Sequence, residues 1–349
     1  MTNTTVPFMR PMRLPELLDQ AIRLYRRNFF KLIAIIGIPF IPLSLIQAWA
    51  QYASTNVQTE LLTNSPSATG PFLEPAYWAS FTALIFVGVL QSILVYGLGA
   101  SAMTNALVND YAGQSPIGVF ESYRQMGFSW LKLAGMRILF GFILFIWILI
   151  PCIGWVTGPG ISFVATLIVL PLMPAVLVLE QPRATLILRR AWDLARTRFW
   201  WMIGFGLALS LLGQFLVTGP VLLAASLTGG LISTSVSSDI LTVVIRSLVT
   251  TFSSLLYLPL HFCAATVIYF DLRVRSEGLD LALQAAREAD PEASILSLAR
   301  TAPPPQGKLF SGQEILYFIL VGLGLGALFA LLFGGLFLFA AAAISAGGL

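Results

Sequence analysis

Long apolar runs alternate with short polar segments along this chain, and the pattern predicts helices that cross a membrane. A helix needs about 20 apolar residues to cross roughly 30 Å of hydrocarbon. Seven runs meet that need, near residues 29–49, 77–107, 130–150, 161–179, 200–217, 240–270 and 315–344. The sequence therefore predicts an all-α integral membrane protein, a multi-pass helical bundle with about seven transmembrane helices.

The composition strengthens this prediction. The chain has 349 residues, of which 57% are hydrophobic and 10% charged, and its mean hydropathy is +0.84. A protein of this composition has too few polar side chains to cover a water-facing surface. We therefore expect the protein to reside in a cell membrane, the plasma or inner membrane.

The basic residues are clustered between the apolar runs. Clusters span 10–31, 124–137, 183–198 and 273–275, with Arg287, Arg300 and Lys308 behind the last one, and only Arg246 lies outside them. Loops rich in Lys and Arg stay on the cytoplasmic side. We therefore expect a cytoplasmic N-terminus and an extracytoplasmic C-terminus, with external loops at 51–76, 151–160 and 219–239.

The segment before the first apolar run has the periodicity of an amphipathic helix. Its apolar positions are Leu14, Leu17, Leu18, Ala21, Ile22, Tyr25 and Phe29, and its polar positions are Glu16, Asp19, Gln20, Arg23, Arg26 and Arg27. Such a helix can lie in the headgroup plane with its arginines toward lipid phosphate. The alternative is a helix packed against the cytoplasmic loops, and the sequence leaves both open.

This basic helix recurs along the chain. Residues 21–30 match residues 191–200, and a weaker copy covers 120–133. Each copy precedes a pair of spans, and each pair ends on an acid: Asp110, Glu180 or Asp271. We therefore expect three pseudo-repeats of an amphipathic interfacial helix plus a transmembrane hairpin, with these acids paired to arginines of the amphipathic helices.

These predictions divide the chain into four parts. Residues 1–28 form a cytoplasmic N-terminus with the amphipathic interfacial helix, and residues 29–271 form a membrane core of six transmembrane helices. Residues 272–313 form a cytoplasmic amphipathic helix and a linker, which Pro303–Pro305 stiffens. Residues 314–349 form a glycine-rich C-terminal transmembrane helix.

Two sets of residues are candidates for a functional site. The first set is basic and expected to face lipid at the interface: Arg23, Arg26, Arg27, Arg189, Arg190, Arg196 and Arg198. The second set is polar and lies within the spans: Arg246 and His261. A buried basic side chain usually faces a cavity or a partner charge. The alternatives are that Arg246 snorkels to the interface and that His261 only forms hydrogen bonds between helices.

Three short motifs carry a family resemblance: residues 269–280, the opening helix at 14–19, and Arg198–Trp200 at the start of a span. With these motifs the chain resembles, over roughly residues 10–285, the bacterial multi-pass family called the membrane domain of glycerophosphoryl diester phosphodiesterase. The resemblance implies a stand-alone membrane domain, as in many members. The separate catalytic domain of other members would require about 250 soluble residues and several polar ligands, whereas the only histidine is His261. We therefore do not expect phosphodiesterase activity.

No catalytic, metal-binding, cofactor-binding or nucleic-acid-binding motif is present in the sequence. We expect a non-enzymatic membrane component that organises lipids or partner proteins. Its partners would be anionic lipid headgroups, another membrane protein, or a second copy of the chain. The alternative is a transporter or channel for a small solute, with a path near Arg246 and His261 that Gln91 and Gln214 would also line.

Overall fold

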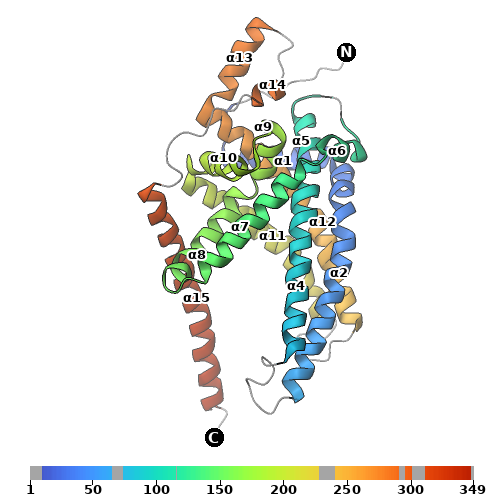
Figure 1. The fold of residues 1–349 in the computed structure, drawn as a ribbon, viewed down its shortest axis with the longest axis vertical. Helices are drawn as coiled ribbons and strands as arrows, with labels where there is room; N and C mark the ends of the chain where they lie inside the picture. Colours follow the sequence, from blue (N-terminus) through green and yellow to red (C-terminus); the bar gives the residue numbers. More distant parts are fainter. Residues whose placement is uncertain are drawn as a thin grey trace.

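The computed structural model describes residues 10–64, 74–114, 116–227, 240–290, 295–300 and 311–346, which form helices and no strand (Figure 1). Six helices are long and apolar enough to cross a membrane, and a bent pair makes a seventh span if it counts as one. The structure thus confirms an all-helical chain with six to seven apolar helices able to span a membrane. The spans are Phe29–Leu61, Pro75–Tyr111, Trp130–Ile148, Phe199–Ala224, Val243–Glu277, Gly312–Leu331 and the bent pair Ile153–Val169 with Met173–Glu180.

Short helices alternate with long ones along the chain. The order is α1 (Leu14–Arg27), α2 (Phe29–Asn64), α4 (Pro75–Ile93), the π-helical η1 (Leu94–Gly99), α5 (Ala100–Tyr111), α6 (Val119–Met126), α7 (Trp130–Ile148), α8 (Ile153–Val164), the π-helical η2 (Ala165–Val169), α9 (Met173–Glu180), α10 (Ala184–Arg196), α11 (Phe199–Leu227), α12 (Ile240–Glu277), α13 (Leu279–Ala289), α14 (Ile295–Ala299) and α15 (Gly312–Ala346). The short helices α1, α6 and α10 lie at one end of the bundle, which we call the polar end (Figure 1).

The densest packing lies near the polar end. Helix α5 is buried along almost its whole length, as are α9 and the C-terminal half of α12. The ring of Tyr111 on α5 stacks on Phe270 of α12, with centroids 4.8 Å apart. This core fixes the positions at which three spans reach the polar end.

The spans away from the polar end expose a broad apolar surface. It includes Phe81, Ile85, Phe86, Phe142, Phe145, Leu211, Phe215, Leu222, Leu223, Leu328, Phe329 and Leu331. A soluble protein seldom exposes so many large apolar side chains, whereas hydrocarbon solvates them well. The exposed side chains therefore agree with a bundle embedded in lipid.

The apolar face of α1 packs against protein. Leu17 and Ala21 are fully buried where α1 crosses α12, and the Tyr25 hydroxyl donates a hydrogen bond to the carbonyl oxygen of Leu256 at 3.0 Å. Arg23 and Arg26 are exposed on the opposite face. The apolar face thus packs against a span rather than against the cytoplasmic loops that the sequence offered as the alternative, and the basic face remains exposed.

All three segments that we expected to be external loops are partly helical, since α11 also continues through residues 219–227; residues 65–73 and 228–239 lie outside the described ranges. Helix α2 continues through residues 51–64, because Ala, Gln, Glu and Leu favour a helix there and no proline follows Pro42 until residue 66. Helix α8 begins at Ile153, inside the expected loop 151–160. Gly154, Gly158 and Gly160 of this segment are buried, as is typical where small residues allow helix backbones to approach.

Helix α15 packs against α8 through two of these close contacts. A Cβ atom at Gly160 would overlap the carbonyl oxygen of Phe318, and one at Gly322 would overlap the carbonyl oxygen of Val156. By contrast, a Cβ atom at Gly324 would have no heavy atom within 4 Å. The seventh span is therefore held to the bundle at glycines that tolerate no side chain.

This packing predicts different effects for two neighbouring substitutions. Gly322→Val should lower the free energy of unfolding by about 1–3 kcal/mol, since overpacking forces the two helices apart. Gly324→Val is the matched control and should leave stability nearly unchanged. Unfolding of the purified protein by denaturant in detergent measures both. Equal stabilities of the two variants would show that α15 does not depend on this contact.

Candidate functional site

The acid at the end of the first hairpin joins α1 to α5. Asp110 is buried, and one of its carboxylate oxygens accepts a hydrogen bond from the Asn28 side-chain amide at 2.8 Å. The Arg27 guanidinium lies 3.2 Å from the other oxygen. Arg27 ends the amphipathic helix α1, so the expected pairing between this acid and an interfacial arginine is present.

The acid at the end of the third hairpin holds the start of the described chain. Asp271 accepts a hydrogen bond from the backbone N–H of Met12 at 2.8 Å and another from Arg275 Nε at 2.8 Å. Arg275 in turn donates to the Met12 carbonyl oxygen at 2.6 Å. Here the arginine comes from the same helix as the acid, and the amphipathic helix is fixed through its backbone.

The acid at the end of the second hairpin belongs to a larger buried network. Glu180 accepts hydrogen bonds from Arg190 Nε at 2.8 Å and from the Tyr269 hydroxyl at 2.7 Å. Arg190 also pairs with Glu277, which accepts a hydrogen bond from Arg273 Nε at 2.8 Å. We call these five residues the Glu180 network. Its two guanidinium groups balance its two carboxylates, so it joins α9, α10 and α12 without a net charge.

Burial alone would disfavour the charged form of Arg190. The hydrogen bonds and charges of Glu180 and Glu277 outweigh this cost and raise the pKa of Arg190. The side chain is only 8% exposed. We expected Arg190 to face lipid, and the structure differs because the carboxylates of two other helices draw its guanidinium inward.

The other expected interfacial arginines lie nearer the surface. Arg23 pairs with Asp19, and Arg26 is exposed with no carboxylate within 4 Å in the described part of the chain. Arg189 and Arg196 both lie beside Asp193, at 3.9 and 3.0 Å. Arg198 lies over the Trp201 ring, 5.1 Å from its centroid.

Burial raises the pKa of Asp193 above its usual value, and the charges of Arg196 and Arg189 only partly offset this effect. Neither carboxylate oxygen accepts a hydrogen bond from the described residues. Asp193 is thus a weaker partner for these arginines than Glu180 is for Arg190.

Arg246 and His261 do not lie together. Arg246 is exposed on α12, whereas the ring of His261 lies between helices with Nδ1 3.3 Å from the Tyr257 hydroxyl. That hydroxyl donates to the Leu209 carbonyl oxygen of α11 at 2.9 Å. Gln214, expected beside the same path, is also exposed. Among the described residues, Arg246 and Gln214 therefore lie on the surface, apart from the His261 ring between α11 and α12.

A polar pair that we did not predict lies within the spans. The Arg137 guanidinium of α7 lies 4.9 Å from the centroid of the Tyr96 ring on η1, and Arg137 Nε is buried without a hydrogen-bond partner. No carboxylate of the described residues is within 4 Å of Arg137. Arg137 lies two turns inside an apolar run, and this position could have identified it from the sequence. We had instead counted it as part of the basic cluster at 124–137.

Within the described ranges, no group of three or more His, Cys, Asp or Glu side chains could hold a metal ion. The charged groups near the polar end are instead arranged as ion pairs between helices. These ion pairs join one helix to another.

The Glu180 network predicts a large effect for one substitution. Arg190→Met removes the cation between two buried carboxylates and should lower the free energy of unfolding by about 3–5 kcal/mol. Arg26→Met removes an exposed arginine and should change it by less than about 1 kcal/mol. Denaturant unfolding in detergent compares the two variants. Similar small losses in both would mean that the network does not support the fold.

Comparison with protein-family models, with curated proteins and with solved structures finds no match for this chain.

Proposed function

We propose that this protein is a non-enzymatic, multi-pass membrane component that organises anionic lipids or partner proteins at its polar end. The observation that carries the proposal is a set of exposed arginines on short amphipathic helices that buried ion pairs hold in place. Guanidinium groups at a membrane surface attract anionic headgroups. A helix fixed in position presents them in a defined arrangement.

The proposal includes three repeated units, each an amphipathic helix followed by a hairpin. Two features support the repeat beyond the sequence. The π-helical segments end at the same distance before an acid, Gly99 before Asp110 and Val169 before Glu180. Tyr96 and Tyr257 stand at the same distance before the acids of the first and third units. Tyr96 packs between spans, and the Tyr257 hydroxyl forms a hydrogen bond to another span.

Tyrosines of the short helices also support the repeat. Tyr25 of α1 donates a hydrogen bond to a backbone carbonyl of α12, and Tyr123 of α6 donates one to the Ile35 carbonyl of α2. Burial of the Tyr123 hydroxyl also raises its pKa to about 12. Equivalent helices thus use the same side chain to attach to a span.

We further propose that the polar end faces the cytoplasm. The clusters of basic residues lie on the short helices at that end, and the positive-inside rule places such segments on the cytoplasmic side. Membership of the phosphodiesterase membrane-domain family, and with it a bacterial inner membrane, stays part of the proposal and rests on the short motifs alone.

No catalytic role is part of the proposal. The acids that end the three hairpins, Asp110, Glu180 and Asp271, are each held by arginines or backbone donors. A general acid or base must be able to reach a substrate. Buried carboxylates that are fully committed to structural pairs suit a scaffold better than an active site.

Lipid selectivity tests the proposal. The Arg23→Gln/Arg26→Gln variant of the full-length protein should bind phosphatidylglycerol more weakly, by about 1 kcal/mol for each arginine removed near the surface. Native mass spectrometry measures this preference by comparing the binding of phosphatidylglycerol with that of phosphatidylcholine. Arg287→Gln/Arg300→Gln is the control, because these arginines lie on the segment behind α12. A wild-type protein without any preference for phosphatidylglycerol would refute the proposal.

The alternative function is transport of an anionic solute, and the unpaired Arg137 beside Tyr96 is the observation that favours it. A cation within a span usually faces a cavity or a counter-charge. Because Arg137 lies near α12, the helix that carries His261, the path of the solute would run between α4, α7 and α12.

Cysteine labelling separates the two functions. On a background with Cys152→Ser and Cys263→Ser, single cysteines at Leu258 and Phe262 flank His261 on buried sides of α12. A sealed bundle should protect both positions from a membrane-impermeant maleimide in vesicles. Labelling comparable to that of a cysteine at the exposed Arg26 position would reveal a water-filled path and favour the transporter.

A further inference from the structure

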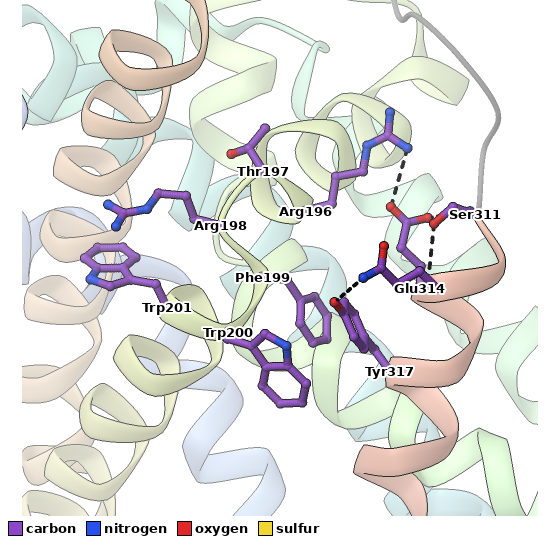
Figure 2. A pocket seen from close by; sticks show the side chains of 10 residues that line it. Arg196, Thr197, Arg198, Phe199, Trp200, Trp201, Ser311, Glu314 and Tyr317 are labelled. Carbon is purple, nitrogen blue, oxygen red and sulfur yellow. Dashed lines mark hydrogen bonds and ion pairs between the residues drawn. The ribbon is translucent and has the colours of Figure 1, made fainter.

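A cavity of about 410 Å³ lies at the polar end where α10 meets α11 and α15 begins (Figure 2). Its walls come from two segments that are far apart in the sequence: Arg196, Thr197, Arg198, Phe199, Trp200 and Trp201 on one side, and Ser311, Gln313, Glu314 and Tyr317 on the other. The cavity thus exists only because the last span packs against the turn between α10 and α11.

One side of the cavity is aromatic. Phe199 is buried and stacks on Tyr317, with ring centroids 5.0 Å apart, and Trp200 meets the Tyr317 ring edge-on at 5.2 Å. Trp200 is 53% exposed. Below these rings, Leu320 of α15 is exposed on the surface that continues into the apolar spans. Tryptophan and tyrosine are the side chains that favour the boundary between headgroups and hydrocarbon.

The other side of the cavity is charged, and the charges are unequal. Arg196 lies 3.6 Å from the Glu314 carboxylate and points toward it (Figure 2). Glu314 is also fixed by a hydrogen bond of 2.6 Å from the Ser311 backbone N–H, which caps α15. Arg196 is therefore shared between Glu314 and Asp193, and its charge is matched.

Arg198 is the cation without a counter-charge. Its guanidinium extends away from Glu314 along the Trp201 ring (Figure 2), and no carboxylate of the described residues lies within 4 Å of it. Arg198 directly precedes Phe199, the first residue of α11. The unpaired N–H groups in the first turn of a helix add positive potential beside it.

We propose that this cavity binds one anionic glycerophospholipid from the leaflet at the polar end. The phosphate lies at Arg198 and the start of α11, and the glycerol and upper acyl chains lie against Trp200 and Tyr317. The combination of one unbalanced guanidinium with exposed aromatic rings above an apolar surface suits a ligand that is anionic at one end and apolar at the other. The inference rests on the proposed lipid-organising function and assigns that function a specific site.

A bound lipid would also connect the last span to the core. The cavity has α10 and α11 on one wall and the start of α15 on the other, so a ligand that fills it contacts both. The lipid would therefore act with the Arg196–Glu314 pair and the Phe199–Tyr317 stack in holding α15 at the polar end.

The test compares lipid affinities of full-length variants by native mass spectrometry. Arg198→Gln should weaken the tightest phosphatidylglycerol binding event about fivefold, the share of one interfacial cation, and Trp200→Leu should weaken it as well. Arg300→Gln is the matched control, an exposed arginine on the segment behind α12 and outside both proposed lipid sites, and should leave that event unchanged. Thermal unfolding by circular dichroism confirms that each variant is folded.

Three outcomes would overturn the inference. Folded Arg198→Gln and Trp200→Leu variants that bind phosphatidylglycerol like the control would exclude this cavity. Wild-type binding of glycerol 3-phosphate alone with the affinity of phosphatidylglycerol would mean a site for a soluble phosphate and not for a lipid. Equal affinity for phosphatidylcholine would remove the requirement for an anionic headgroup.

Failure of the inference is distinct from failure of the proposed function. If phosphatidylglycerol is preferred and Arg23→Gln/Arg26→Gln reduces that preference while Arg198→Gln does not, the protein organises lipid through α1 and the cavity is not a lipid site. If the wild-type protein shows no preference at all, both proposals fail.

Discussion

A carboxylate can be buried at the edge of a membrane only when a cation or several hydrogen-bond donors lie beside it, and this constraint organises the whole bundle. Asp110, Glu180 and Asp271 each end a returning span, and each is matched by donors from another helix or segment. The partners cannot move without leaving a buried charge unpaired. The ends of the spans are therefore fixed relative to α1 and α10, and the short helices are fixed relative to the spans.

The same constraint explains why the two ends of the molecule differ. Near the polar end the helices are tightly packed and joined by charged and aromatic contacts, including the Tyr111–Phe270 stack. Farther along, the spans expose large apolar side chains and contact one another through few polar groups. In lipid there is no hydrophobic drive between helices, so association depends on close packing and on polar pairs. The polar end is therefore where the helices are most tightly joined.

Arginine has two roles in this protein, and the surroundings decide which one it takes. Arg190 lies between two carboxylates in the interior, whereas Arg26 and Arg198 keep their charge without an acidic partner. The first role joins helices, and the second leaves a guanidinium group without a carboxylate partner. Both follow from the same planar guanidinium, which binds carboxylates and phosphates equally well.

The amino-acid sequence by itself determined the all-helical membrane class, the approximate spans and the clustering of arginines, because hydropathy over 20 residues and the cost of burying charge are local properties of a segment. It also indicated the pairing of Asp110 and Glu180 with interfacial arginines, since acids and arginines recur at the same ends of the spans. From the sequence we did not predict that α2 continues past Trp49 or that α8 begins inside the expected loop. Glycine and polar residues suggest loops locally, and only the contact with α15 reveals that Gly160 serves packing.

Tertiary structure alone decided which arginines turn inward and which side chains form a cavity. Arg190 and Arg189 are adjacent in the sequence, yet only Arg190 reaches Glu180 and Glu277, because its side of α10 faces α9 and α12. The cavity near Arg198 unites residues 196–201 with residues 311–317, and no local pattern links these segments. Sequence periodicity reports the environment of one helix, whereas partners from distant segments are set by the packing of the whole bundle.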